Sequence, residues 1–186
     1  GGASPNTYSG LTNLASGTLN FNKDGAIGTG TLRIGGATTL DNTSGGTVTN
    51  TNVNAQQWNG DFTYKGSNSL DLGAGAVVLS ASRQVMVSAN TLIVGGGISG
   101  SGFTLTKAGT GALVLNGVVG TAAGGVTLNG GSLTLAGSNT YTGVTTLTAG
   151  TLNYNNSSAL GTGRLIIGGT GGVVIDNTSG NTITSL

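Results

Sequence analysis

The chain has 186 residues, and 104 of them are Gly, Thr, Asn or Ser. It carries 6 basic and 5 acidic side chains, for a formal net charge of +1. Because Cys and His are absent, a disulfide framework, a thiolate or imidazole catalyst and a typical zinc site are excluded. The scattered cations of a nearly neutral chain also argue against nucleic acid or an anionic membrane surface as a partner.

The apolar content predicts a folded chain without a membrane span. No apolar run approaches the roughly 20 residues that cross a bilayer, and no basic start leads into an apolar stretch as in a signal peptide. Disorder is not expected, because Pro occurs once and the apolar residues are regularly spaced. We therefore expect one domain that is part of a larger protein.

The two ends of the chain carry copies of one sequence block. Residues 6–36 and 139–169 are identical at 19 of 31 positions when they are aligned with an offset of 133 residues. The similarity continues after a two-residue insertion in the second copy, where DNTSG at 41–45 occurs again at 176–180. A duplicated sequence block indicates a repeat architecture, in which stacked units bury apolar surface that a single unit could not bury by itself. We predict one solenoid segment over 1–186, with the duplicated block at 6–52 and 139–186 and further coils over 53–138.

Short pairs of apolar residues at positions i and i+2 recur along the whole chain. Period two places each pair on one face of a strand. The residues between the pairs are turn formers, and no segment has the 3.6-residue apolar period of a helix. In chain order the pairs are Leu19/Phe21, Leu32/Ile34, Leu70/Leu72, Val77/Leu79, Val85/Val87, Phe103/Leu105, Leu113/Leu115, Val126/Leu128, Leu133/Leu135, Leu152/Tyr154, Leu165/Ile167 and Val173/Ile175.

The spacing of these strands fits either an antiparallel sandwich or barrel or a parallel β-solenoid. Three observations favour the solenoid. Each strand has one inward pair, the turns lack the two-residue signals of hairpins, and a duplicated block implies translation along an axis. We predict an all-β parallel β-helix with about three short strands per coil and about seven or eight coils. Leu, Val and Ile then fill the core, while Thr and Asn form uncharged ladders outside.

Two stretches follow a pattern that runs L-x-K-x-G-x-G-x-L-x-L, then N-T-Y-x-G-x-T, then x-x-G-x-L. In this pattern the chain resembles the autotransporter-associated β-strand repeat, a passenger-associated repeat of bacterial autotransporter-like surface proteins. One departure is that Val118–Ser138 separates halves that are usually closer, which we interpret as an extra coil. The matching residues, to which we assign a structural role, are Leu105, Lys107, Gly109, Gly111, Leu113, Leu115, Asn139, Thr140, Tyr141, Gly143, Thr145, Gly150 and Leu152, and in the first copy Asn6, Thr7, Tyr8, Gly10, Thr12, Gly17 and Leu19.

The resemblance implies a right-handed parallel β-helix within a secreted passenger. Such passengers leave the cell through a C-terminal outer-membrane barrel, so the implied location is extracellular or on the bacterial cell surface. The predicted function is a non-catalytic structural segment: a stalk, an adhesin shaft or an extracellular fibre, for example in a biofilm matrix. The partners that this function implies are a host or neighbouring-cell surface or a polysaccharide.

Both ends of the chain also point to self-association. The first ten residues enter directly into repeat sequence, and NTITSL stops within a repeat. Solenoids normally hide their end strands under polar caps, because open edges template association. We predict either excision from a longer array or end-to-end stacking into a homo-oligomer or head-to-tail filament.

An enzyme is the main alternative, since some parallel β-helices degrade polysaccharides with clustered carboxylates. The acids of this chain are dispersed in sequence. Asp41 and Asp176 share one repeat position, which we interpret as an Asx turn, and Asp24 belongs to a KDG turn. Only Asp61 and Asp71 could meet across coils. We predict no catalytic, cofactor-binding or metal-binding residue.

The one aromatic cluster leaves a carbohydrate-binding alternative open. Trp58 and Tyr64, with Phe62 between them, are either surface-contact residues that stack on sugars or, in the interpretation we favour, a plug in the core of a wide coil. The basic residues stand singly and are expected in solvent; they are Lys23, Arg33, Lys65, Arg83, Lys107 and Arg164.

Ice binding is a further alternative, because Thr-rich solenoids can present flat Thr arrays. It needs TxT at one fixed position per coil. The TxT sequences at Thr104–Thr106, Thr140–Thr142 and Thr182–Thr184 keep no common spacing, so we rank this function last.

Overall fold

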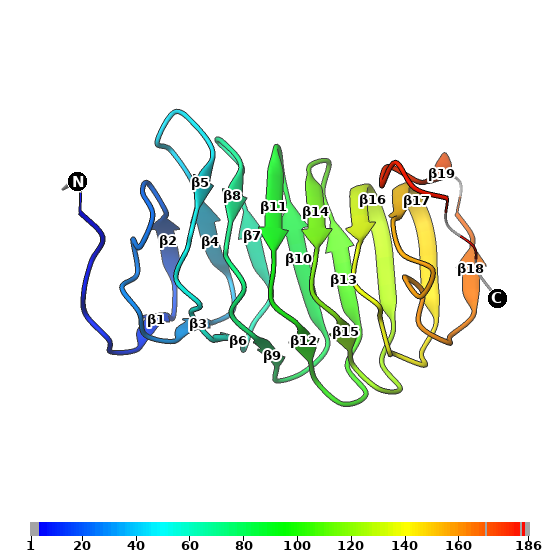
Figure 1. Cartoon of the computed structure of the whole chain (residues 1–186), viewed down its shortest axis with the longest axis horizontal. Helices are drawn as coiled ribbons and strands as arrows, with labels where there is room; N and C mark the ends of the chain where they lie inside the picture. The colour runs from blue at the N-terminus through cyan, green and yellow to red at the C-terminus, as the bar shows by residue number, and fades with distance from the viewer. Residues whose placement is uncertain (1–3, 170, 183, 185–186) are drawn as a thin grey trace.

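The computed structural model describes residues 4–169, 171–182 and 184. Within them the chain forms strands and turns and no helix, and it winds into a β-solenoid of about eight coils (Figure 1). The described chain begins at one end of the stack and reaches the other end at its C-terminal coils, so sequence order follows the long axis. The predicted all-β parallel solenoid is thus confirmed. The right hand of its coil stays a prediction.

Three parallel faces run along the solenoid, and hydrogen bonds join each strand to the next one on its face. The first face contains β1 (Thr12–Leu14), β3 (Leu32–Ile34), β6 (Gln56–Trp58), β9 (Val77–Leu79), β12 (Ile98–Ser99) and β15 (Val119–Gly120). The second contains β2 (Gly17–Asn20), β4 (Thr38–Asp41), β7 (Phe62–Tyr64), β10 (Arg83–Val87), β13 (Leu105–Ala108), the first halves of β16 (Val126–Leu135) and β17 (Thr145–Tyr154), and β18 (Leu165–Ile167). The third contains β5 (Val48–Thr49), β8 (Leu70–Asp71), β11 (Thr91–Val94), β14 (Ala112–Leu115), the second halves of β16 and β17, and β19 (Val173–Asp176).

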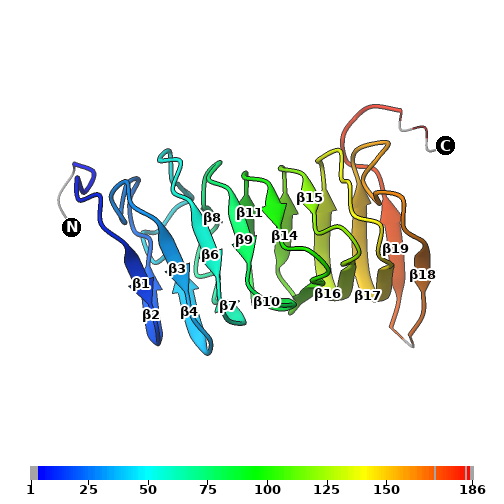
Figure 2. The same ribbon diagram turned by 90° about the horizontal axis from the view of Figure 1, so that it is seen from below.

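The length of a coil varies along the rod. Leu32 pairs with Gln56, which lies 24 residues later, whereas Thr91 pairs with Ala112 after 21 and Val126 with Thr145 after 19. β15 and β16 supply strands to all three faces within residues 118–138, so the predicted extra coil is present. Figure 2 shows the coils stacked side by side along the axis.

β16 and β17 are long because each continues around the corner between the second and third faces. The register between them shifts between Leu128 and Ser132. At this corner Gly131 has a φ of +65°, and a Cβ there would lie 2.3 Å from the carbonyl oxygen of Gly111. A side chain is therefore excluded by both backbone conformation and space.

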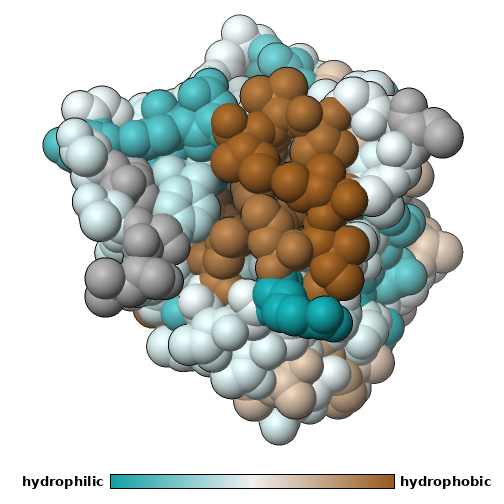
Figure 3. Space-filling model, turned by 90° about the vertical axis from the view of Figure 1, so that its right-hand side faces the viewer, coloured by the Kyte–Doolittle hydropathy of each residue, from teal (hydrophilic) through white to brown (hydrophobic). Residues whose placement is uncertain are grey.

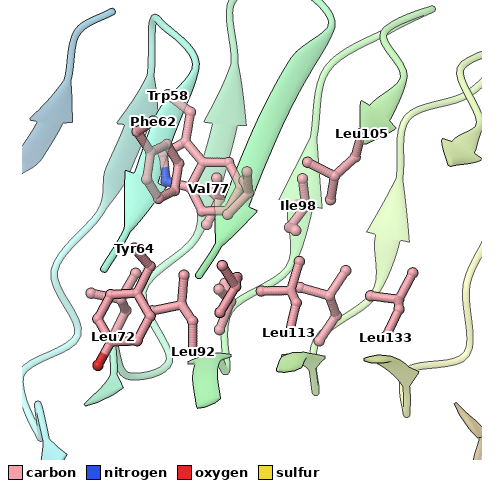
Figure 4. Packing of buried hydrophobic residues seen from close by; sticks show 14 of the residues in the cluster. Trp58, Phe62, Tyr64, Leu72, Val77, Leu92, Ile98, Leu105, Leu113 and Leu133 are labelled. Carbon is pink, nitrogen blue, oxygen red and sulfur yellow. The ribbon is translucent and has the colours of Figure 1, made fainter. Parts of the chain in front are cut away.

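A single apolar core fills the solenoid from the first described coil toward the last. Inward residues of successive coils lie directly over one another, as Leu92, Leu113 and Leu133 do in one row of Figure 4. Because period-two strands stack in register, each apolar pair of the sequence becomes one step of a continuous column.

The surface-contact role considered for Trp58 and Tyr64 is wrong. Both side chains are 0% exposed. The ring of Trp58 packs edge-on against Phe62 with a centroid separation of 5.0 Å (Figure 4). The Tyr64 hydroxyl donates to the carbonyl of Asn68. These rings fill the core next to the longest coil, in which paired residues lie 24 positions apart, as expected of aromatic side chains that fill a wide coil.

The two copies of the duplicated block lie on different faces. Residues 12–14 form β1 on the first face, but their copies at 145–147 open β17 on the second face. Likewise β3 lies on the first face and its copy, β18, on the second. The offset of 133 residues corresponds to about six 21-residue coils and one further face. The block is therefore translated along the axis and also turned by one face.

Candidate functional site

Lys107 is the main departure from the expectation that basic residues lie in solvent. Its side chain is 1% exposed and points into the core from β13, in a column between Val85 and Leu128. A charged residue in an apolar column needs internal partners, because burial without them is costly.

Three backbone carbonyls supply those partners. The Lys107 Nζ donates to the carbonyl oxygens of Ala108 at 2.9 Å, Gly109 at 2.9 Å and Gly130 at 3.1 Å. Gly130 belongs to the next coil, so the ammonium ties two coils together at the corner between the second and third faces. Burial lowers the pKa of Lys107 to about 8.

The glycines that follow Lys107 in the motif make the same corner. Gly109 has a φ of +83°, and a Cβ there would lie 2.3 Å from the Val87 carbonyl oxygen of the preceding coil. A Cβ on Gly111 would lie 2.8 Å from the Ala89 carbonyl. The K-x-G-x-G pattern therefore describes a corner in which the backbone of one coil touches the backbone of the last.

The N-T-Y segment of the second copy connects coils on both of its sides. The Asn139 Oδ1 accepts from the Val119 backbone N–H at 2.7 Å, and its Nδ2 donates to the Ala159 carbonyl at 2.6 Å. The buried Tyr141 hydroxyl lies 2.7 Å from the Thr145 Oγ1. Burial raises the pKa of Tyr141 to about 12. These motif side chains bind the chain itself.

Among the described residues, the same segment of the first copy contacts a following coil and no preceding one. Asn6 Nδ2 donates to the Ala26 carbonyl at 2.6 Å, as its counterpart does, but Asn6 Oδ1 accepts from the Lys23 ammonium at 3.2 Å in place of a preceding coil. Tyr8 is 46% exposed, although its hydroxyl lies 3.0 Å from the Thr12 Oγ1.

Asp41 bridges two coils, which corrects its interpretation as an Asx turn. Its buried carboxylate accepts from the Ser67 backbone N–H and hydroxyl and from the Asn42 N–H, each at 2.8 Å. Burial acts to raise the pKa of Asp41, but these hydrogen bonds and the Lys65 ammonium outweigh it and leave the pKa lowered. The Asx turn is formed one residue later, where the Asn42 Oδ1 accepts from the Ser44 N–H at 3.0 Å.

The second copy repeats this turn without the bridge. Asn177 Oδ1 accepts from the Ser179 N–H at 3.0 Å, so the turn again begins one residue after the acid. Asp176 itself is exposed, and its Oδ1 accepts from the Asn177 N–H.

The remaining acids also serve local or coil-to-coil contacts. Asp24 accepts from the backbone N–H and hydroxyl of Thr51, which lower its pKa. Asp61 precedes β7 and accepts from the Gln84 N–H, whereas Asp71 lies in β8 on another face and accepts from the Gly73 N–H. The two do not form a pair. No group of three or more acids that could hold a metal ion occurs among the described residues.

A shallow hollow of about 300 Å³ lies over the second face. Asp61 is the one ionisable side chain among its described lining residues, which otherwise include Thr39, Thr63, Gln84 and Met86. A single carboxylate does not make an acid–base pair. Its aromatic lining residue, Phe62, is buried, so the hollow offers sugars no stacking platform.

Inward residues of the last described coil are exposed. Figure 3 shows an apolar surface at this end of the rod. Ile167 of β18 and Ile175 of β19 are 58% and 47% exposed. Their counterparts in the first copy, Ile34 and Leu40, are 0% exposed under the coil that follows. A hollow of about 390 Å³ between Tyr154, Leu160, Leu165 and residues 161–163 belongs to the same end.

Parallel coils whose corners are tied by motif side chains define a β-solenoid repeat protein. Three segments of the chain, residues 2–21, 105–134 and 130–153, match the family model of the passenger-associated-transport-repeat and are similar to that repeat. The resemblance found in the sequence is thus confirmed, and the repeat and the fold fit an autotransporter passenger-like structural segment. No curated protein and no solved structure matches the chain significantly. Among the described residues no helix is long and apolar enough to cross a membrane.

The matched segments do not keep to one face. The first ends just beyond β2 on the second face, and the last ends near the close of β17 on the third face. The repeat therefore describes strand-and-corner units that fit more than one face of the coil.

Proposed function

We propose that this chain is a non-catalytic structural segment of an exported bacterial surface protein, serving as a stalk, adhesin shaft or extracellular fibre. One observation carries the proposal: the polar side chains of the motif are used in contacts between coils. Lys107 and Asn139 are buried and bond to neighbouring coils, and the buried Tyr141 hydroxyl contacts Thr145 of its own coil and the Ala159 carbonyl of the next. Side chains used in this way stabilise a rod, and these three are not free to act on a substrate.

The physical properties of the rod suit a spacer. Stacked coils rise by about 4.8 Å each, so about eight coils make a rod of roughly 35 Å. The scarce charges prevent like charges from stacking at that spacing, where they would repel. The proposed location is the cell surface or its exterior, the proposed contacts are a host or neighbouring surface or a polysaccharide, and the proposed self-association is end to end.

Surface display tests the passenger role. Residues 1–186 would be placed between a secretion signal and an outer-membrane barrel, with an epitope tag at the outer end. We expect antibody access to the tag on intact cells and slow cleavage of the segment by added protease. A matched variant, Leu92→Asp, places a charge in the buried column and should be cleaved rapidly. Rapid cleavage of the unaltered segment, or cleavage of a polysaccharide by the purified chain, would contradict the proposal.

The structural role proposed for Lys107 is tested against Lys65, whose side chain is 67% exposed. Lys107→Met removes three charge-assisted hydrogen bonds and should lower the free energy of unfolding by about 1–3 kcal/mol at pH 7. Lys65→Met should change it by less than about 1 kcal/mol. Urea unfolding measures both.

The pH dependence separates a buried ammonium from a general packing defect. The pKa of Lys107 is about 8 in the folded chain, whereas the ordinary pKa of a lysine side chain, expected in the unfolded chain, is 10.5. Between these values the unfolded chain binds more protons, so the stability of the unaltered chain relative to Lys107→Met should rise from pH 8 to 10.5. If the stability difference between the unaltered chain and Lys107→Met does not change between pH 8 and 10.5, the ammonium is not buried.

A further inference from the structure

We propose that the rod binds one internal water molecule on the inner side of the corner between β5 and β6, where the longest coil turns from the third face to the first. The water accepts a hydrogen bond from the Gln56 Nε2 and donates one to the Asn50 Oδ1. The site lies in the core of the rod, so this inference goes beyond the structural role proposed above and does not rest on it.

Polar side chains occupy this corner although the core around it is apolar. Gln56 takes an inward position on β6, in a column between Leu32 of the preceding coil and Val77 of the next. Asn50 directly follows β5. The side chains of Gln56 and Asn50 are both 1% exposed. Because burying a polar group is costly unless it is hydrogen-bonded, each of them needs partners inside the corner.

Two atoms of this corner have no partner within the protein. Among the described residues, three buried side-chain nitrogen or oxygen atoms make no hydrogen bond, and the Gln56 Nε2 and the Asn50 Oδ1 are two of the three. Asn50 bonds across the corner to Asn54, and Gln56 follows Asn54 by two residues and faces inward. The two atoms, one a donor and the other an acceptor, therefore lie on the inner side of one corner.

The orientation of the Asn50 amide is fixed by its other contacts. Its Nδ2 donates to the Asn54 Oδ1 at 2.9 Å and to the carbonyl oxygens of Asn52 at 3.2 Å and Leu72 at 3.3 Å. The Asn54 amide is fixed in turn, because its Nδ2 donates to two backbone carbonyls of the preceding coil. Exchanging the nitrogen and oxygen of Asn50 would place an oxygen against three oxygens, so the unpartnered atom is the acceptor.

The orientation of the Gln56 amide is fixed by the only tryptophan of the chain. The Trp58 Nε1 donates to the Gln56 Oε1 at 3.2 Å. An indole N–H can only donate, so exchanging the nitrogen and oxygen of Gln56 would bring two donors together. The unpartnered atom of Gln56 is therefore the donor.

Water is the molecule that fits these two atoms. Both groups are neutral, so a charged ligand would be buried without an opposite charge. The neighbouring side chains of Leu32 and Val77 are apolar and buried, and they offer a larger polar ligand no further contacts. Water both accepts and donates, and buried waters normally bind about two to four polar groups that would otherwise be unpaired.

The water completes a chain of hydrogen bonds that runs in one direction. The Trp58 indole donates to Gln56, and Gln56 donates to the water. The water donates to Asn50, Asn50 donates to Asn54, and Asn54 donates to the preceding coil. Because every member donates to the next, each bond polarises and strengthens its neighbours. The aromatic plug is in this way connected through the corner to the coil before it.

Magnetic relaxation dispersion of the solvent tests the site, because it counts long-lived internal waters. We expect Gln56→Met to reduce this count by one, since Met has a similar length and makes no comparable hydrogen bond. Gln57→Met is the matched control. It makes the same substitution at the next residue, whose side chain bonds to Arg33 on the outer side of β6, and it should leave the count unchanged.

Each other result contradicts the site. An unchanged count in Gln56→Met would show that no water depends on this side chain, and a reduced count in both variants would show a general loosening of the strand. If Gln56→Met does not fold, a high-resolution crystal structure of the unaltered chain decides. Density for a water within hydrogen-bond distance of the Gln56 Nε2 and the Asn50 Oδ1 supports the site, whereas a direct bond between these atoms overturns it.

A double-mutant cycle provides a second test. Gln56→Met and Asn50→Leu should each lower the folding equilibrium constant about tenfold or more, because each leaves a buried polar group of the other residue unpaired. The double variant should lose less than the product of the two effects, since one water serves both side chains. Gln57→Met combined with Asn50→Leu should give the simple product. A simple product for Gln56→Met with Asn50→Leu as well would show that nothing connects the two side chains.

Discussion

The two copies of the duplicated block share their sequence and differ in what covers them. The first copy has a coil over its later strands, so Ile34 is fully buried, whereas Ile167 at the same repeat position is largely exposed. The N-T-Y segment shows the reverse, with Tyr8 exposed and Tyr141 fully buried on a preceding coil. Because the side chains are the same, the comparison separates the contribution of a neighbouring coil from that of the residue itself.

The difference also explains what the repeat requires. In a solenoid the energy of a unit depends on the interfaces with its neighbours more than on contacts within the unit. Gly143 illustrates this, because a Cβ there would lie 2.5 Å from the Ala123 carbonyl oxygen, whereas a Cβ on Gly10, its counterpart, would meet nothing within 4 Å. The motif residue is needed where a preceding coil is present.

The largest expected contrast is between Ile34→Ala and Ile167→Ala. The first leaves a cavity in the column and should lower the free energy of unfolding by about 2–5 kcal/mol. The second removes an exposed side chain and should cost less than about 1 kcal/mol. Urea unfolding of the dilute chain measures both. Ile34→Val, expected to cost about 0.5–1.5 kcal/mol, checks that the loss scales with the volume removed.

Equal losses of unfolding free energy in Ile34→Ala and Ile167→Ala would contradict this expectation, because they would mean that Ile167 is covered in solution. If the loss for Ile167→Ala grows with protein concentration, the cover is a second chain. A loss that does not depend on concentration would instead indicate that the end coil folds over itself.

The next contrast is between Gly143→Ala and Gly10→Ala. The added methyl group at position 143 meets backbone of the preceding coil and should destabilise the chain by about 1–3 kcal/mol. At position 10 it meets nothing, and restriction of the unfolded chain should make the change neutral or stabilising by up to about 1 kcal/mol. Thermal unfolding distinguishes these opposite signs. A loss at position 10 as large as that at 143 would show that backbone conformation, and not the neighbouring coil, sets the requirement.

The sequence predicts the core well and the polar contacts poorly. Inward pairs such as Leu133 and Leu135 were predictable, since a period of two needs only neighbouring residues. The burial of Lys107 was not predictable in this way, because one of its three carbonyl partners, at Gly130, comes from the next coil. The partner of Asp41, Ser67, likewise lies 26 residues away. Contacts of this kind depend on the length of the coil, which varies along the chain.

The placement of each strand on a face was also beyond sequence patterns. Both copies of the block show the same alternation of inward and outward residues, yet they occupy different faces. The duplicated block keeps the same pattern on both faces, so one strand-and-corner unit can occupy more than one face. The position of a unit is fixed by the number of residues that precede it in the stack.

A smaller contrast concerns Asp41→Asn and Asp176→Asn at the two DNTSG sequences. Asp41→Asn weakens the hydrogen bonds from Ser67 and should cost about 1–2 kcal/mol at pH 7, whereas Asp176→Asn should cost almost nothing. The pKa of Asp41 is lowered in the folded chain, so its contribution is present above the ordinary value of 3.8 and is lost as the pH falls through the lower folded value. The stability difference between the unaltered chain and Asp41→Asn should therefore shrink below pH 3.8, as denaturant unfolding in acid can measure. A difference that persists at the lowest pH would show that the side chain acts through shape and not through its charge.

The smallest expected effects are those of Tyr141→Phe and Tyr8→Phe, and they test the coil below the N-T-Y segment. The Tyr141 hydroxyl is buried against the Thr145 Oγ1, so its removal leaves that hydroxyl short of a partner and should cost about 0.5–1.5 kcal/mol. The Tyr8 hydroxyl makes the same contact with Thr12, but at the exposed surface. Because water can replace the lost hydrogen bond there, Tyr8→Phe should be close to neutral. Hydrogen exchange of the amides in each segment measures the two effects locally. Equal protection losses would mean that Tyr8 is also covered in solution.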